Sequence, residues 1–340
     1  MVRWTKAVVA VVAAAALLTA CGSDPATTPA GAGDTGHGDK NVATGGAQFA
    51  TADTETAKLK ADVGPGVFPR TVTQAMGQTR IEKKPTRVIV LDSGELDDVL
   101  ALGVTPVGMA TTAGQQGVPS YLADRVRNIA TVGPTNTLDL EKIAALKPDL
   151  ILGSKLRVSD LYPQLSAIAP TVFSIRPGFP WKENFLLVGA ALGAEEQATK
   201  LLNDYQAKAN QVKAKLPGAP TISLVRFLSG NIRLYGNKSF IGVILSDVGL
   251  SRPANQNVDE LAVQISKENI DQAAADWIFY SSYGADVSPD QKTVTSGPIW
   301  RNSSAVKAGH AIAVDDEVWF LGLGPIGAMR VLDDLGKFLA

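Results

Sequence analysis

One segment constrains the fold more than any other, because residues 182–216 have the pattern of a single amphipathic helix. The segment contains no proline, and its interior glycines, Gly189 and Gly193, fall in its first third. At 1.5 Å per residue the helix is roughly 50 Å long, and a mean helix has only about 11–12 residues. No second heptad run is present to form a coiled coil with it, so we expect a rigid strut that joins two bodies. Its apolar positions recur in steps of three and four: Leu187, Ala191, Ala194, Ala198, Leu201, Tyr205, Ala209, Val212 and Leu216.

Short apolar strands alternate with helices on both sides of this segment. This alternation predicts parallel sheets covered by helices, and hence an α/β fold with two Rossmann-like lobes joined by one long helix. The hydrophobic content of 45% is ordinary for a globular protein. The expected strands are residues 87–91, 106–109, 149–153 and 171–175 before the strut, and 221–225, 231–235, 276–280 and 309–314 after it, with 221–225 and 231–235 forming a hairpin.

The amino-terminal region has the composition of an export signal. Arg3 and Lys6 precede an uncharged apolar stretch, and the small residues before Cys21, the only cysteine, match a cleavage site. The apolar run is shorter than the ~20 residues that span a bilayer. A cysteine directly after that site resembles a bacterial lipobox, which implies lipid on the thiol and a location on the outer face of the cell membrane. An ordinary signal peptide that happens to contain a cysteine is the alternative.

Residues 22–62 contain almost no large apolar side chains and predict a flexible tether. Together these observations divide the chain into a signal peptide at 1–20, a lipidated cysteine and tether at 21–70, an amino-terminal lobe at 71–181, the connecting helix at 182–216 and a carboxy-terminal lobe at 217–340.

Charge and residue content argue against several classes of function. The formal charge of −1 becomes −3 when Arg3 and Lys6 are removed with the signal, which does not suit nucleic acid. The only histidines are His37 and His310, which are too few for a typical site that binds a bare metal ion. The sequence also contains neither a base–nucleophile pair nor a Gly-x-Ser-x-Gly motif, which argues against nucleophilic catalysis. Residues 322–327 match G-x-G-x-x-G, but only thirteen residues follow, too few for a βαβ unit. We therefore expect a binding protein without metal ligands or cofactor, and no enzyme.

Arginines and aromatic residues gather at the ends of the predicted strands and in nearby loops. In open α/β sheets ligands bind outside the carboxyl ends of strands. Guanidinium groups donate hydrogen bonds to ligand oxygens, and aromatic rings pack against the apolar carbon surface of a ligand. This set of residues therefore suits a large ligand that has both oxygen atoms and apolar surface. The candidate ligand-binding residues are Arg176, Trp181, Arg226, Phe227, Arg233, Tyr235, Tyr280 and Trp319.

Five stretches carry a resemblance to a known family. They are RVIVLD at 87–92, LEKIAALKPDL at 140–150, KENFL at 182–186, RLYG at 233–236 and DDEVWFLGLGP at 315–325. With the lipobox and the strut, they resemble the class III solute-binding proteins of ABC importers, which serve iron–siderophores, haem and cobalamin. The chain looks most like the iron(III)-siderophore branch of Gram-positive bacteria, in which hydroxamate ligands are common.

The resemblance implies a monomeric receptor that holds a ferric siderophore between its lobes and delivers it to permease subunits. Family members dock through one exposed glutamate on each lobe, and the matching positions are Glu141 and Glu268. Haem or cobalamin is the competing ligand class, with Tyr280 or Tyr283 as a possible axial residue. A sensor of the same fold and a lipid-anchored cell-envelope enzyme also stay open as functions.

Overall fold

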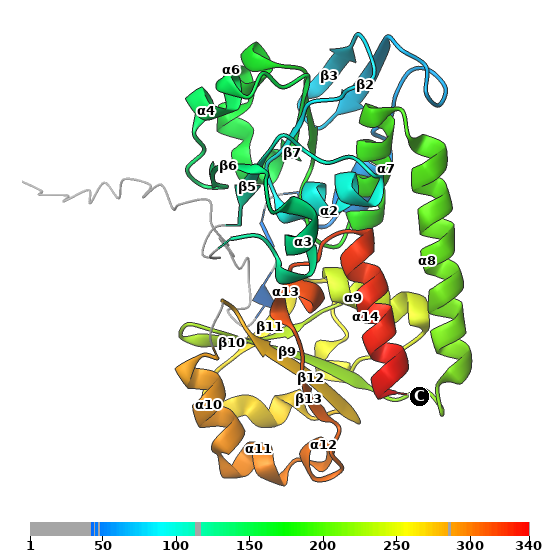
Figure 1. Ribbon diagram of the computed structural model, residues 1–340. Coiled ribbons are helices and arrows are strands. Elements are labelled where there is room, and N and C mark those ends of the chain that lie inside the picture. Colours follow the sequence, from blue (N-terminus) through cyan, green and yellow to red (C-terminus); the bar gives the residue numbers. More distant parts are fainter. Residues whose placement is uncertain (1–41, 44, 47, 113–116, 285–286, 340) are drawn as a thin grey trace, which may run out of the picture.

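Two α/β lobes, each built on its own sheet, lie one above the other (Figure 1). The computed structural model describes residues 42–43, 45–46, 48–112, 117–284 and 287–339. The signal sequence at 1–20 and Cys21 lie outside these ranges. Among the described residues, no helix combines the length and the apolar character needed to cross a membrane. The α/β fold class predicted from the alternating pattern is confirmed.

The amino-terminal lobe has an all-parallel sheet with the strand order β6-β5-β4-β7-β8. All three residues of β4 and all five of β7 are buried, as expected for strands covered by helices on both faces. A short hairpin of β2 and β3 precedes the sheet. The elements are β2 Arg70–Gln74, β3 Gly77–Ile81, β4 Val88–Val90, α2 Ser93–Ala101, β5 Gly108–Thr111, η1 Ser120–Leu122, α3 Ala123–Val126, β6 Ala130–Pro134, α4 Leu140–Ala145, β7 Leu150–Ser154, α5 Lys155–Val158, η2 Ser159–Leu161, α6 Tyr162–Ile168 and β8 Thr171–Ser174.

The carboxy-terminal lobe has a mixed sheet with the strand order β1-β11-β10-β9-β12-β13. The predicted hairpin is confirmed, since β9 and β10 pair in antiparallel fashion. The strands β12 and β13 run parallel to β9. The elements are β9 Ile222–Leu228, β10 Asn231–Tyr235, α9 Phe240–Val248, η3 Ala254–Gln256, β11 Ala262–Ile265, η4 Lys267–Ala273, β12 Trp277–Ser282, α10 Pro289–Ser296, α11 Pro298–Asn302, α12 Ser304–Lys307, β13 Ala311–Ala313, α13 Asp316–Trp319 and α14 Pro325–Phe338.

The connection between the lobes differs from the single helix predicted over 182–216. It consists of two helices, α7 (Trp181–Leu192) and α8 (Glu195–Lys215), with a break at Gly193 and Ala194. Gly193 adopts a left-handed φ of 66°, the usual way in which glycine ends a helix. A side chain here would also meet the ring of Phe68 at 2.7 Å. The apolar spacing continues across the break, which is why periodicity did not reveal it.

The segment before residue 70 is more ordered than the tether predicted from its composition. Strand β1 (Val42–Ala43) adds to the edge of the carboxy-terminal sheet beside β11, and α1 (Ala52–Thr56) packs near α7. Phe49 supplies the apolar anchor, because its buried ring meets the ring of Phe179 edge-on at 5.1 Å. A single aromatic residue thus fixes a stretch whose average composition is that of a linker.

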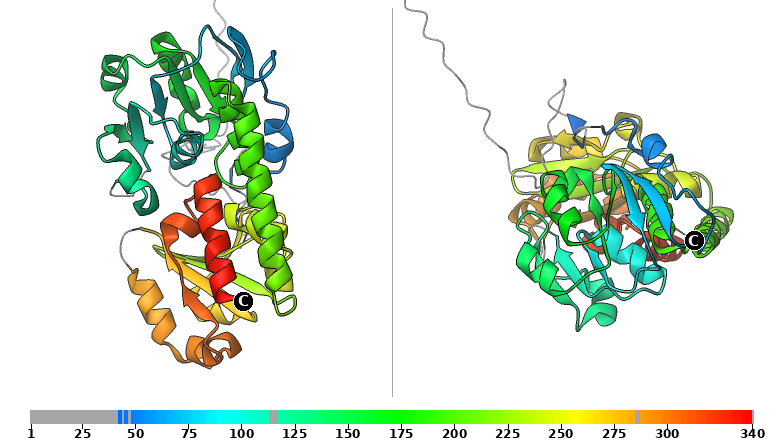
Figure 2. Two further views of the ribbon diagram at one scale, coloured as in Figure 1. Left: turned by 45° about the vertical axis from the view of Figure 1, so that its right-hand side comes forward. Right: turned by 90° about the horizontal axis from the view of Figure 1, so that it is seen from above.

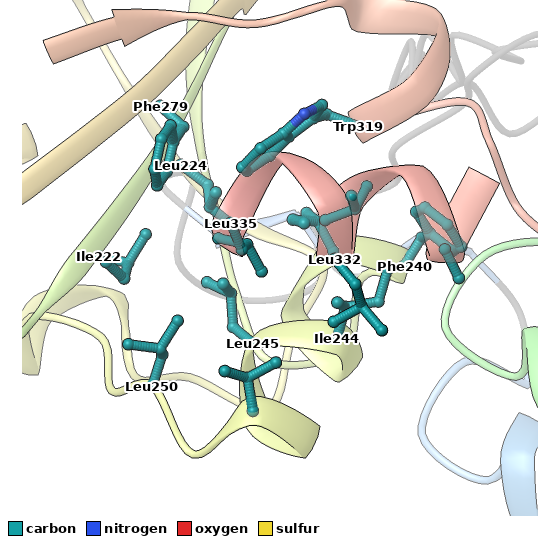
Figure 3. Close-up of a cluster of buried hydrophobic side chains, with 14 of the residues drawn as sticks. Ile222, Leu224, Phe240, Ile244, Leu245, Leu250, Phe279, Trp319, Leu332 and Leu335 are labelled. Carbon is teal, nitrogen blue, oxygen red and sulfur yellow. The ribbon is translucent and has the colours of Figure 1, made fainter. Parts of the chain in front are cut away.

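The core of the carboxy-terminal lobe lies between its sheet and two helices, α9 and α14 (Figure 3). On its other side α14 runs beside α8 (Figure 2). The buried side chains of α14 therefore fill the space between the sheet and the connector. They include Leu332 and Leu335, which lie close to Ile244 and Leu245 of α9 (Figure 3).

The glycines of the G-x-G-x-x-G match serve close packing and not a dinucleotide. No strand follows α14 within the described residues. A Cβ on Gly324 would lie 2.7 Å from the side chain of Asp97, and one on Gly322 would lie 3.2 Å from the Cα of Gly327. The motif lets the start of α14 approach α2 of the other lobe.

Candidate functional site

An ion-pair network lies near the carboxyl ends of β9 and β12. Arg226 of β9 donates from Nε to Oδ1 of Asp316 at 2.7 Å and from a terminal nitrogen to Oδ2. Ser281 of β12 stands opposite Arg226 in the parallel register and donates to the same carboxylate at 2.6 Å. Asp316 is the first residue of α13, where a carboxylate also meets the favourable end of the helix dipole.

Aromatic side chains enclose the Arg226 guanidinium. The hydroxyl of Tyr235 accepts from a third guanidinium nitrogen at 3.2 Å. The ring centroid of Tyr283 lies 4.7 Å from the guanidinium carbon, and that of Phe320 lies 5.2 Å away. Arg226 is only 5% exposed, so these bonds and ring contacts hold it rigidly at the base of the site.

Arg233 is the cross-strand partner of Arg226 in the antiparallel register of β9 and β10. Paired residues of neighbouring strands project on the same face of a sheet. The side chains of Arg226 and Arg233 therefore lie next to each other on one face of the sheet. Like Arg226, Arg233 is buried, with 8% of its surface exposed. The arrangement places two guanidinium groups on one face of the carboxy-terminal sheet, one of them paired with Asp316.

Arg157 is a candidate site residue that was not predicted from the sequence. It lies on α5, directly after the carboxyl end of β7 in the amino-terminal lobe, and it donates to the buried carboxylate of Asp92 at 3.0 Å. The charge of Asp92 raises the pKa of Arg157, and Tyr283 of the other lobe is close enough to contribute. Tyr283 thus packs on Arg226 and contributes to the electrostatic surroundings of Arg157. The same strand-end rule that selected Arg226 also applies to β7 and could have found Arg157.

A cavity of about 370 Å³ opens beside this network. Its lining comes from three chain segments that meet at the carboxyl ends of β12 and β13 and at the start of α10. Tyr280, half-buried, is the one sequence-predicted residue that lines it, and Asp316 connects it to Arg226. The lining residues are Tyr280, Ser281, Ser282, Gly284, Val287, Gln291, Ala313, Val314, Asp315, Asp316 and Glu317.

A second cavity, of about 430 Å³, lies along α9 and includes Asp53, Phe179 and Arg252 in its lining. None of the ligand-binding residues predicted from the sequence lines it. Acidic and basic groups are mixed on its wall, since Asp53, Asp247 and Asp259 accompany Lys238 and Arg252. We favour the smaller cavity as the site because it adjoins the strand ends and the paired arginines.

Buried carboxyl groups lie below the amino-terminal half of the site. Glu95 of α2 is fully enclosed, and burial together with the charge of Asp92 raises its pKa to about 8. At neutral pH Glu95 is therefore mostly protonated and does not offset the positive charge of Arg157. The charged groups at this point are thus Arg157 and its partner Asp92.

Three aromatic residues predicted to wall the cleft lie in the core instead. Trp181, Phe227 and Trp319 are each 0% exposed. Trp181 packs edge-on against Tyr205 and Phe240, and Trp319 packs on Phe279 (Figure 3) while its ring N–H donates to Asp334. Phe227 follows Arg226 on β9, and the alternation of a strand turns it to the opposite face, towards Trp300. These assignments are corrected: none of the three is available to a ligand.

Arg176 and Tyr235 are also less accessible than predicted. Arg176 is 6% exposed, donates to the carbonyl oxygen of Gly45 at 2.5 Å and lies 4.5 Å from the centroid of the Phe49 ring. Burial, with the nearby charge of Arg157, lowers the pKa of Arg176 to about 10. Tyr235, at 6% exposure, orients Arg226. Arg176 is thus covered by the ordered amino-terminal segment, which composition had assigned to the tether.

The two predicted docking residues are both exposed and occupy similar positions in the two lobes. Glu141 lies in the first turn of α4, and Glu268 lies in the first turn of η4. Hydrogen bonds from its own backbone N–H and from Ser266 lower the pKa of Glu268, so its carboxylate stays charged. Both residues are accessible to a partner at the surface.

Across the described ranges, no group of three or more His, Cys, Asp or Glu side chains is placed to hold a metal ion. The site combines guanidinium, hydroxyl and aromatic groups with the carboxylates of Asp315, Asp316 and Glu317 at the cavity. Such a set can bind a large oxygen-rich anion by charge-assisted hydrogen bonds and ring contacts.

Comparisons with known proteins agree with this chemistry. The model of the family described as periplasmic binding protein matches residues 88–318. The chain is 37% identical over 283 residues to the Bacillus subtilis protein named "Probable siderophore-binding lipoprotein YfiY", covering 79% of this chain and 87% of that protein. It is 31% identical over 263 residues to the achromobactin-binding periplasmic protein of Dickeya dadantii, covering 74% and 86%.

A solved structure shows the same architecture. Staphylococcus aureus SirA in complex with staphyloferrin B superposes with a TM-score of 0.71 at 33% identity, covering 79% of this chain and 98% of SirA. The similarity spans both lobes and the connection between them.

Proposed function

The chain belongs to the periplasmic binding protein family, and from this premise we propose that it is the receptor of an ABC importer for a ferric siderophore. Members of this family bind a transported ligand and carry out no reaction on it, so the protein is not an enzyme and the siderophore is not a cofactor. One observation carries the proposal: Arg157 and Arg226 lie at or just after the carboxyl ends of sheet strands in the two lobes, and a cavity opens at the strand ends beside the Arg226–Asp316 pair.

The ligand is a siderophore of the hydroxamate type, whose own oxygens hold the iron. Arg157 and Arg233 donate hydrogen bonds to oxygens of the complex. Arg226, paired with Asp316, forms the floor of the site beneath them. Tyr280 and Tyr283 cover its apolar surface. Guanidinium groups suit this role because they hold negatively charged oxygens without competing for the metal.

Delivery to the permease uses Glu141 on one lobe and Glu268 on the other. Both carboxylates are exposed in the first turn of a helix, and both are placed to meet basic residues of a partner. The receptor acts as a monomer held to the outer face of the cell membrane by lipid on Cys21. The lipobox residues before Cys21 and the lipoprotein description of a relative support this anchor.

Titration of tryptophan fluorescence with a panel of ferric complexes tests the ligand. We expect saturable quenching by ferric hydroxamates and weaker or no response to catecholates, ferric citrate, haem and cobalamin. Arg157→Gln and Arg233→Gln should each weaken binding about tenfold or more, because each removes a charged hydrogen bond worth about 1.5–3 kcal/mol. Arg80→Gln, an exposed arginine paired with Glu82 outside the site, is the matched control.

Two results would contradict the proposal. A chain that binds none of the ferric siderophores is not such a receptor. Tight binding that survives both Arg157→Gln and Arg233→Gln would place the ligand elsewhere, with the cavity along α9 as the next site to examine. Preference for a citrate or catecholate complex would retain the receptor and replace the hydroxamate assignment.

A further inference from the structure

We propose that Asp97 is a positioning residue for ligand binding, because its carboxylate joins the two lobes and thereby sets the spacing of the arginines across the cleft. Asp97 lies on α2 of the amino-terminal lobe and is 0% exposed. It touches neither the cavity nor any arginine of the site. Its effect on the ligand is therefore transmitted through the elements it connects.

The joint is built from two backbone hydrogen bonds that cross between the lobes. The N–H of Ile326 donates to Oδ1 of Asp97 at 2.7 Å, and the N–H of Gly327 donates to Oδ2 at 2.9 Å. Both N–H groups belong to the first turn of α14, where no carbonyl of the helix is available to accept them. A carboxylate from the other lobe thus caps the helix that forms the core of the carboxy-terminal lobe, which favours one relative position of the two bodies.

Two further contacts define this geometry. The hydroxyl of Tyr121 lies 2.8 Å from Oδ2 of Asp97 and 2.9 Å from the carbonyl oxygen of Gly322, so its single proton is shared between the two lobes. Gly324 leaves room for the approach, since a Cβ there would lie 2.7 Å from the Asp97 side chain. The contact between Gly324 and Asp97 is therefore close-packed.

The elements that form the joint are the same ones that hold the arginines of the site. In the amino-terminal lobe, Asp92 lies five residues before Asp97. It caps α2 and binds Arg157. In the carboxy-terminal lobe, α13 carries Asp316, which binds Arg226, and the chain continues from α13 directly into the segment that meets α2. There Ser93 donates to the carbonyl oxygen of Leu321 at 3.3 Å. A shift at Asp97 therefore changes the separation of Arg157 and Arg226.

This inference rests on the proposed function only where it predicts affinity, and the lobe geometry can be measured without any ligand. We suggest distance measurements between spin labels at Lys142→Cys on α4 and Lys292→Cys on α10, both exposed, in the full chain carrying Cys21→Ser. The variant is Asp97→Asn, whose amide presents one acceptor and one donor to two N–H groups. Asp149→Asn is the matched control, because Asp149 also accepts backbone N–H groups, from Thr86 and Arg87, but within one lobe.

We expect Asp97→Asn to broaden the distance distribution between the lobes and to weaken ferric hydroxamate binding about tenfold. Asp149→Asn should leave both unchanged even if it lowers the unfolding midpoint. An unchanged distance distribution in Asp97→Asn would overturn the proposal, whatever happens to stability. If Asp97→Asn does not fold, Tyr121→Phe takes its place. We expect this variant also to broaden the distance distribution between the lobes. An unaltered distribution would contradict the proposed joint. If no siderophore binds the unsubstituted chain, the proposed function fails while the distances still decide the role of Asp97.

Discussion

Arg226 and Asp316 form a buried ion pair in which two guanidinium nitrogens donate to the two carboxylate oxygens. The pair joins the end of a strand to the start of a helix that is ninety positions away in the chain. It is both a structural link and the base of the proposed ligand site. Its two roles can be separated by substitution.

Removing one partner of this pair should destabilise the fold strongly. Arg226→Ala leaves the Asp316 carboxylate buried without its counter-ion, and breaking a buried pair in this way costs about 3–5 kcal/mol. The double substitution Arg226→Met with Asp316→Leu should recover most of that loss, because neither charge remains buried. Urea unfolding measures both. A single variant as stable as the unsubstituted chain would show that water replaces the missing partner.

Charge reversal at the docking positions should separate uptake from binding. Glu141→Lys and Glu268→Lys together should stop siderophore uptake by cells while leaving the affinity for the ligand unchanged, because both residues are exposed and neither belongs to the cavity lining. Glu196→Lys, an exposed reversal in the first turn of α8, is the control and should transport normally. Normal uptake by the double variant would remove the docking assignment.

The buried carboxyl groups of α2 predict that stability falls as the pH rises. Burial raises the pKa of Glu95 to about 8 and that of Asp97 to about 7, and it raises the pKa of Asp98 well above its ordinary value. The folded state therefore holds these protons at pH values where the unfolded chain releases them. Their stabilisation is complete below about pH 4 and is lost as the pH approaches 8, at up to about 1.4 kcal/mol per pH unit for each group.

Urea midpoints between about pH 5 and pH 8 measure this loss, and Glu95→Gln should flatten the curve because glutamine does not titrate. Asp139→Asn, at the exposed cap of α4, should leave the slope unchanged. A midpoint that rises with pH over this range would contradict the assignment of these groups.

A methyl group at Gly324 should separate the two lobes at their joint. The new Cβ would lie 2.7 Å from the Asp97 side chain, and overpacking of this kind costs about 1–3 kcal/mol. Gly64→Ala is the control, because no atom lies within 4 Å of the added Cβ. Thermal unfolding should show a lower midpoint for Gly324→Ala alone. Equal midpoints for both variants would mean that α2 yields to the methyl group without cost.

Lipid attachment can be tested at Cys21. The chain with Cys21→Ala should leave the membrane fraction and appear in the medium or in the soluble extracytoplasmic fraction, because no thiol remains to carry the lipid. Immunoblotting of separated fractions measures the change. Continued recovery with membranes would contradict the lipoprotein assignment.

The sequence predicted the architecture better than it predicted the site. Alternating strands and helices depend on local apolar spacing, so the two lobes and the β9–β10 hairpin were correctly predicted. The burial of Trp319 was not predicted, because it depends on contacts with residues of α14 and β12 that follow and precede it in the chain. Phe227 could have been placed correctly from the alternation along β9 once Arg226 was assigned to the opposite face.

Gly193 and Phe49 show where predictions from the average spacing or composition of a segment fail. One left-handed glycine divides a helix whose apolar spacing is continuous, and one phenylalanine anchors a stretch with the composition of a linker. Arg157 escaped notice for a different reason, since its neighbours in sequence gave no aromatic cluster. Its position is set by the buried carboxylate of Asp92, which lies sixty-five positions earlier in the chain.

The break at Gly193 also determines how the two lobes are coupled. Phe185 and Leu187 of α7 lie in the core of the amino-terminal lobe, whereas Tyr205 and Ala209 of α8 lie in the core of the other. The two helices are not confined to one lobe each, because Trp181 of α7 also lies in the carboxy-terminal core and Ala198 of α8 lies in the amino-terminal core. Arg70 ties the two sides of the break together, since it donates to the carbonyl oxygen of Ala190 on α7 and to the carboxylate of Glu195 on α8. The break therefore holds α7 and α8 as one packed pair, and a change in the angle between the lobes has to repack these contacts or bend α8.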